Sequence, residues 1–467
     1  MVTVQAIVKG ETMRKPEDSI IKTYYMISGL FTLSASIIWG INTLFLLHAG
    51  MTLFQVFVVN AVYSGSMAVF EIPTGVFADT LGRRLSFLFS TIVLMAGTLG
   101  YVFAATLSSN FWPFALMSVI LGLAYTFYSG AVEAWIVDAL HHVGYAEPLD
   151  HVFSRAAGIS SICVLIGTVL GGIIGTFNLN FPYIIRALLI LAAFGVAFIR
   201  MKDLGYTRKA VRLGQIPAEM QKIARVSITF GVGNISVRHL ISVSFLFSGF
   251  MMWGWYAWQP YFLKLYGDPS AIWAVGVFAA LFALAQAAGS FSVTIFLKLF
   301  KRRSWLLLAA FGLQAASILG TGLANSFYLS SILFLCFSFA FGLAMPVRQT
   351  YLHSLIPSEN RASIVSFDSL AGSCGSTIGQ IGYGYISEKM SIGSGYIIGG
   401  LVHLLIMPIL VLLARRHDPE DQVVNSESEF DSEPGSVPGS MPDSMPGSMP
   451  GSAPGSAPGS ASNQKPV

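Results

Sequence analysis

The chain has 467 residues, of which 54% are hydrophobic and only 11% are charged. This charged share is less than half of the roughly 25% that is usual in soluble domains, which excludes a soluble enzyme. Because a membrane-spanning helix needs about 20 apolar residues, the chain has room for about a dozen spans with short connections. Composition therefore predicts an all-α, multi-pass membrane protein.

Charge and cysteine content narrow the class further. The formal net charge is +4, but many acidic residues lie after residue 417, so the body of the chain is distinctly basic. In a membrane protein such an excess is typical of cytoplasmic loops, and nucleic-acid binding is not expected. The three cysteines lie in apolar stretches without CxxC spacing. Neither a metal nor another cofactor is predicted.

The predicted elements are twelve apolar segments, split six and six. Residues 1–23 are basic and carry no cleavable signal, so the first span is expected to remain as an anchor. The segments lie near 24–47, 53–78, 85–106, 113–140, 152–176, 182–200, 240–264, 271–297, 304–324, 328–352, 363–386 and 394–414. The sequence thus predicts twelve transmembrane helices in two six-helix halves.

The basic residues predict the orientation of these spans. With the amino terminus in the cytoplasm, all but three of the 27 Lys and Arg residues fall on the cytoplasmic side. The exceptions are Lys264 and Lys389 outside, and Arg186, which lies one turn inside the outer surface and is expected to snorkel to it. Both termini are therefore expected in the cytoplasm, and the location is expected to be the plasma membrane.

The same pattern divides the chain into five regions. We expect a cytoplasmic amino terminus (1–23), a first bundle (24–200), a cytoplasmic central loop (201–239), a second bundle (240–416) and a cytoplasmic tail (417–467). The tail is acidic at first and then repeats Pro-Gly-Ser. Such a composition cannot bury apolar area, so the tail is predicted to be disordered.

A charged motif lies where the second span meets the third. It consists of Gly75, Asp79, Gly82, Arg83 and Arg84. The first glycine would allow a helix to approach closely, and the second would permit a tight reversal. This pattern resembles the signature of the major facilitator superfamily, and together with the twelve spans the resemblance covers about residues 20–416. It implies the fold of that family and a latch that joins the two halves in the outward-facing state.

The corresponding loop of the second half departs from this pattern. It reads Lys298-Leu-Phe-Lys301-Arg302-Arg303, with Lys298 at the position of the aspartate. The basic pair is kept, but a second latch of the same chemistry is not expected.

The fifth span carries regularly spaced glycines. Gly158, Gly167, Gly171 and Gly175 follow the spacing of a motif found in proton-driven exporters of the superfamily, although Gly172 replaces its proline. The alternative is that these small residues only allow close helix packing, as in any transporter.

Two carboxylates lie inside the predicted spans without an obvious partner. Counted along their helices, Glu71 and Glu133 both lie about 10 Å from the inner surface. An ionised group at this depth is energetically costly, so it is expected to have an ionic partner or a function. The resemblance places Glu133 in a cavity-lining span, so we predict it as the proton-coupling carboxylate, with Glu71 second. A structural hydrogen bond is the alternative.

Other charges are expected to form pairs. Asp138 and Arg155 lie near the inner ends of the fourth and fifth spans, and Arg348 and Asp368 hold corresponding places in the second half. Because transporter halves are related, both pairs are assigned a structural or gating role.

The seventh span suggests where a substrate could bind. Trp255, Trp258 and Gln259, with Asn42 of the first span, could form an aromatic wall for an apolar or cationic compound. The alternative is an aromatic belt at the membrane surface.

These features favour a transporter that works by alternating access. The preferred activity is proton-coupled export of an amphipathic or lipophilic compound, and the alternative is proton-coupled uptake of a small polar solute. No HExxH, GxSxG or Walker motif supports an enzyme or an ATP-driven pump. The expected partners are a small molecule, protons and lipid, and a monomer is expected.

Overall fold

The computed structural model describes residues 16–107, 111–128, 131–147, 149–206, 233–356 and 361–422. These ranges are almost entirely helical, and their only β pairing is an isolated bridge between Arg302 and Gln422. Most of the central loop, and residues 423–467 with the Pro-Gly-Ser repeat, lie outside the described residues.

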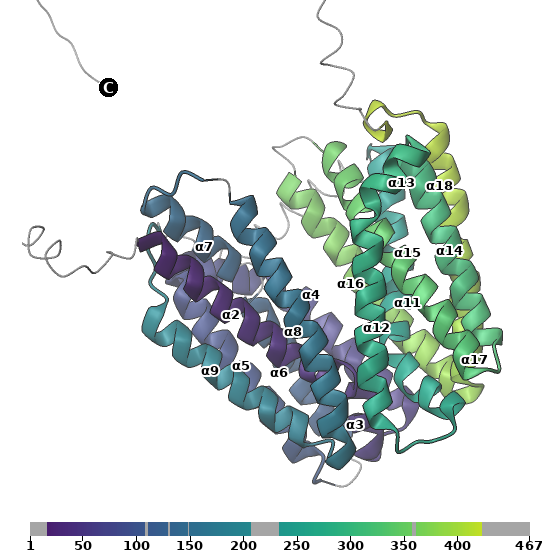
Figure 1. The fold of residues 1–467 in the computed structure, drawn as a ribbon, viewed down its shortest axis with the longest axis horizontal. Coiled ribbons are helices and arrows are strands. Elements are labelled where there is room, and N and C mark those ends of the chain that lie inside the picture. Colours follow the sequence, from purple (N-terminus) through teal and green to yellow (C-terminus); the bar gives the residue numbers. More distant parts are fainter. Residues whose placement is uncertain are drawn as a thin grey trace, which may run out of the picture. The chain divides into compact units, whose positions relative to one another are not determined.

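The helices form two groups that follow the sequence. The first half contains α2 (Pro16–Trp39), α3 (Asn42–His48), α4 (Leu53–Leu81), α5 (Arg83–Ala104), α6 (Phe111–Tyr128), α7 (Ala131–His142), α8 (Asp150–Phe177) and α9 (Phe181–Arg200). The second contains α11 (Ile235–Tyr266), α12 (Ile272–Phe291), α13 (Val293–Phe300), α14 (Arg303–Leu323), α15 (Phe327–Ser354), α16 (Arg361–Lys389), α17 (Ile392–Leu404), α18 (Ile406–Arg415) and the 3-10 turn η3 (Pro419–Asp421). In Figure 1 the purple-to-blue helices form one group and the teal-to-yellow helices the other.

The predicted spans correspond to these helices with a few breaks. Ten helices of the described ranges are long and apolar enough to cross a membrane, or eleven when the bent pair α2–α3 counts as one span. The bend between α2 and α3 is 50° and interrupts the first predicted span just after Gly40. The remaining span is α16, whose many Gly and Ser residues lower its hydropathy but let it pack closely. For example, a Cβ on Gly375 would overlap the backbone of Phe245 in α11.

Each half has its own core, and two seams join the halves. Buried aromatic side chains such as Trp135 and Phe114 fill the first half, and Trp253 and Phe282 lie in the second. One seam joins α8 to α12, where a Cβ on Gly172 would lie 2.7 Å from Cα of Gly276. The other seam joins α4 to α16.

The hydrogen bonds between the halves gather at one end of the bundle, which we call the α3 end. There Gln259 of α11 accepts from the backbone N–H of Thr43 (3.0 Å) and donates to the carbonyl of Trp39 (2.8 Å). Along the second seam, Glu388 accepts from the N–H of Phe54 (2.9 Å), and Gln380 donates to Ser64 (3.1 Å). Among the described residues, the hydrogen bonds between the halves thus lie between the α3 end and about the middle of α4. The opposite end, where η3 lies, is called the η3 end.

Candidate transport site and gating residues

The charged motif forms a clamp inside the first half. Gly82 separates α4 from α5 with φ +112°, a left-handed conformation that glycine adopts without steric strain. Asp203, three residues after the end of α9, accepts a hydrogen bond from the N–H of Arg84 (2.8 Å) and lies where a Cβ of Gly82 would be. The Arg84 guanidinium in turn donates to the carbonyl of Phe198 (2.8 Å). The motif therefore ties the start of α5 to the end of α9.

The other motif residues differ in part from expectation. Arg83 lies 3.9 Å from Asp138, so this aspartate pairs with the motif and does not pair with Arg155. The side chain of Arg155 instead lies near that of Tyr25. A Cβ on Gly75 would meet nothing within 4 Å, so the expected close helix approach is absent there. The side chain of Asp79 lies outside the described residues.

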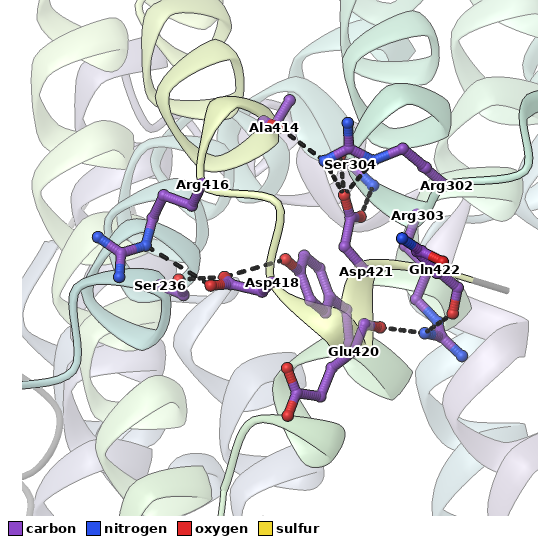
Figure 2. A network of polar contacts seen from close by, with 11 residues as sticks. Ser236, Arg302, Arg303, Ser304, Ala414, Arg416, Asp418, Glu420, Asp421 and Gln422 are labelled. Atoms are coloured by element: carbon purple, nitrogen blue, oxygen red, sulfur yellow. Dashed lines mark hydrogen bonds and ion pairs between the residues drawn. The ribbon is translucent and has the colours of Figure 1, made fainter.

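A related clamp lies in the second half and was missed by sequence reasoning. Arg302 binds Asp421 through Nε (2.8 Å) and Nη2 (2.7 Å), and donates to the carbonyl of Ala414 (2.6 Å). Asp421 also accepts from the backbone N–H and the hydroxyl of Ser304, both at 2.6 Å. Figure 2 shows these groups converging on one carboxylate, which is fully buried. Lys298 takes no part in it.

The segment after α18 makes a second set of contacts. Asp418 accepts from the hydroxyl of Ser236 (2.5 Å) at the start of α11 and lies 3.4 Å from the hydroxyl of Tyr351 in α15. Arg416 lies 3.7 Å from the same carboxylate (Figure 2). Residues 418–422, which composition assigns to the tail, are therefore folded onto the helix ends of the second half.

The expected pair of the second half is present. Arg348 of α15 forms a bidentate contact with Asp368 of α16, at 3.1 and 2.7 Å, and also donates to the carbonyl of Leu240 in α11 (3.3 Å). Their side chains are only 12% and 11% exposed. Such a pair is geometrically specific and is strongly coupled when desolvated.

The two candidate proton carriers lie in one region. The phenols of Tyr24, Tyr125 and Tyr128 are close enough to Glu133 to interact electrostatically with it. Tyr125 is also close enough to Glu71. Both glutamates are exposed, and neither forms an ion pair or a side-chain hydrogen bond with a described residue. Neither carboxylate is therefore sealed inside the part of the bundle that the structure describes.

The proposed substrate residues of α11 have other contacts in this structure. Gln259 is fully buried, and its side-chain amide forms hydrogen bonds with the backbone of Thr43 and Trp39 at the α3 end. Trp258 is 2% exposed, and its ring lies 5.0 Å from that of Phe282 within the core of the second half. Trp255 is half-buried. The spacing of aromatic residues along α11 does not show which of them face inward, which is why these residues were grouped together.

Asn42 belongs to a polar cluster at the α3 end. It accepts from the hydroxyl of Tyr183 (2.9 Å) and donates to Asn60 (3.3 Å). Arg186 lies one turn further along α9 from Tyr183, and its Nε is shielded from solvent. The arginine thus faces the inside of the bundle, and the expectation that it snorkels to the surface is not met.

The glycines of α8 support close packing. A Cβ on Gly167 would overlap Ser36, and one on Gly171 would overlap Ile37, both in α2. A Cβ on Gly175 would make ordinary contacts at 3.5 Å, and one on Gly158 would meet nothing within 4 Å. Two of the four glycines are therefore required by helix contact.

The apolar helices and their arrangement in two halves define a multi-pass membrane protein. The model of the Major Facilitator Superfamily matches residues 24–281 and 274–446. The chain belongs to this superfamily, as its motif suggested.

Individual relatives are distant. An uncharacterized MFS-type transporter, YxaM of Bacillus subtilis (strain 168), is 23% identical over 424 residues, covering 86% of this chain and 98% of the relative. The class H tetracycline resistance protein of Pasteurella multocida is 28% identical over 131 residues, covering 28% of this chain and 30% of the relative. The crystal structure of the nucleoside transporter NupG matches with a TM-score of 0.70 at 12% identity, covering 85% of this chain and 99% of that one. This last likeness shows the fold.

Proposed function

We propose that the chain is a proton-coupled exporter of an amphipathic compound, with Glu133 as the main proton carrier and Glu71 as the second. The observation that carries this proposal is the presence of two accessible carboxylates without a described ionic partner inside membrane helices. By contrast, Asp368 is held by Arg348. An unpaired carboxylate in a span is expensive, so a functional role is the expected reason for it.

The conformation supports a cycle of alternating access. The halves are joined at the α3 end, and the positive-inside pattern assigns the η3 end to the cytoplasm. In this arrangement Glu133 exchanges protons with the cytoplasm. Release of the proton to the cytoplasm would accompany loading of the substrate, and reprotonation from the outside would accompany its release and complete the cycle.

The motif is proposed as the latch of the opposite state. In this structure Arg83 and Arg84 bind partners within their own half, Asp138 and Asp203. When the halves close at the η3 end, Arg83, whose ion pair is long, is the residue best placed to exchange partners. The plasma membrane, the cytoplasmic termini and the five regions set out above belong to the same proposal.

Export is favoured over uptake by one comparison. The relative that matches 28% of this chain is a tetracycline resistance protein, which suggests a drug-like cargo. The glycine spacing of α8 is consistent with this, although Gly167 and Gly171 are also explained by packing.

The test uses purified protein in liposomes with an imposed pH gradient and a pH-sensitive dye. Lipophilic amines, aromatic acids, antibiotics, sugars and nucleosides are added one at a time. Export predicts that an amphipathic compound dissipates the gradient as it moves against the proton. Movement of a polar solute with the proton would establish the uptake function instead. As a matched control, Glu147→Gln changes a carboxylate in the loop after α7 and should leave coupling intact.

A further inference from the structure

The polar cluster at the α3 end contains a buried donor without a partner among the described residues, and so does the neighbourhood of Arg186. Asn60 is 5% exposed, and its Nδ2 has no hydrogen-bond partner among the described residues. The same holds for Nε of Arg186. A chain of hydrogen bonds connects the two neighbourhoods, from Tyr183 through Asn42 to Asn60. Buried donors without acceptors are uncommon and require an explanation.

The surroundings of Arg186 contain no described counter-charge. The titratable side chains that interact with it electrostatically are Tyr63 of α4, Tyr101 of α5, Tyr183 of α9 and Tyr256 of α11. All are phenols, and Tyr256 comes from the other half of the protein. Arginine keeps its charge in proteins, and a charged side chain inside a membrane protein is costly unless it is paired. The described part of the chain supplies no carboxylate for this pairing.

Arg186 is also partly accessible. Its Nε is sealed, whereas the residue as a whole is half-buried, so its remaining exposed surface lies at other atoms. Helices of both halves supply its neighbours, which places it in the interior. A guanidinium in this setting can bind a carboxylate through two parallel hydrogen bonds.

We propose that Arg186 binds an anionic group of the substrate, and that the transported compound is an aromatic or amphipathic carboxylate. Tyr63 and Tyr256, which lie near Arg186, provide phenol rings against which an apolar body can pack. Because Tyr256 belongs to the second half, an anion at Arg186 contacts both halves and can influence their rocking. This inference rests on the proposed function and adds the chemical class of the cargo.

The test measures binding without a proton gradient, so that it is independent of coupling. Wild-type protein in lipid nanodiscs is titrated with three matched ring systems, phenyl, naphthyl and indolyl, each carrying a carboxylate, an uncharged amide or an amine. Binding is followed by tryptophan fluorescence and by thermal stabilisation. The inference predicts that carboxylates bind and that the matching amides and amines bind at least about tenfold more weakly.

Variants locate the effect. Arg186→Gln should weaken carboxylate binding by about tenfold or more. Arg186→Lys should retain part of the binding, because lysine keeps the positive charge but lacks the two parallel donors of the guanidinium. The control Arg200→Gln, at the other end of the same helix, should bind as the wild type does. Equal binding of amides or amines, absence of carboxylate binding, or unchanged binding in Arg186→Gln would overturn the inference. If Arg186→Gln does not fold, the ligand series on the wild type still decides.

The two proposals can fail separately. Glu133→Gln should still bind the carboxylate, since it removes only the proton carrier. Carboxylate binding without proton movement would overturn proton coupling alone. Proton-coupled transport of an amine without carboxylate binding would overturn the role of Arg186 alone.

Discussion

Asp421 accepts a hydrogen bond from the backbone N–H of Ser304 (2.6 Å), and Asp203 accepts one from the backbone N–H of Arg84 (2.8 Å). Ser304 and Arg84 are both the second residue of the third long helix of their half, α14 and α5. Each aspartate lies a few residues after the last α-helix of the same half, α9 for Asp203 and α18 for Asp421. Both therefore satisfy a free N–H group at a helix start, where a negative charge is favoured by the helix dipole.

The first prediction concerns the buried member of this repeated clamp. Asp421→Ala leaves Arg302 without its partner and the start of α14 without its cap, so it should destabilise the protein by about 3 kcal/mol or more. Asp203 is exposed, so Asp203→Ala should cost about 1 kcal/mol or less. The loss of monodisperse protein after heating measures both. Glu420→Ala, an exposed neighbour, is the control, and equal stability of all three variants would contradict the assignment.

The second prediction separates the clamp from the rest of the tail. The clamp residues Asp418 and Asp421 lie before the Pro-Gly-Ser repeat, and residues 423–467 lie outside the described residues. Truncation after Val423 should leave thermal stability and transport nearly unchanged. Truncation after Arg416 also removes Asp418 and Asp421 and should lower the melting temperature by several degrees. Similar melting temperatures of the two truncated proteins would show that the clamp is dispensable.

The third prediction distinguishes packing from a special role of the α8 glycines. Gly171→Ala would force a methyl group into the backbone of Ile37, which should cost about 1–3 kcal/mol. Gly158→Ala belongs to the same motif but faces open space, so its stability should match the wild type. Purified yield and thermal stability give the comparison. Loss of transport in a stable Gly158→Ala protein would instead point to a role beyond packing.

The fourth prediction concerns the pair between α15 and α16. Arg348→Leu leaves Asp368 buried and unpaired, so stability should fall by about 3–5 kcal/mol. The double variant Arg348→Leu with Asp368→Leu removes both charges and should recover most of that loss. If the pair also gates the transporter, the double variant will be stable but transport slowly. Normal transport by the stable double variant would restrict the pair to a structural role.

Sequence reasoning predicted the features that depend on composition and long-range periodicity. The spans, the two halves and the Arg348–Asp368 pair follow from apolar length and from the rule that buried charges are paired. The sequence could predict this pair because both residues are isolated charges at similar depth in neighbouring spans. Asp138 was assigned to Arg155 by the same rule, but Arg83 is a nearer cation in the folded chain.

The features that were missed depend on which way a side chain points or where a loop returns. Trp258 and Gln259 are adjacent, and spacing could not reveal that one fills a core and the other joins the halves. Asp421 lies in a segment whose composition predicts disorder. One feature of the sequence could have indicated this clamp. The basic pair Arg302 and Arg303 repeats the basic pair of the first half and has no acidic partner nearby in sequence.

The fifth prediction tests most directly the claim that Glu133 carries the coupled proton. It compares two kinds of transport in Glu133→Gln, using the compound that the liposome experiment identifies as the substrate. Gradient-driven accumulation requires a proton carrier, whereas exchange of labelled for unlabelled compound at equal pH requires only binding and movement of the halves. The account predicts that Glu133→Gln loses accumulation and keeps exchange. Undiminished accumulation in Glu133→Gln would show that Glu133 does not carry the proton.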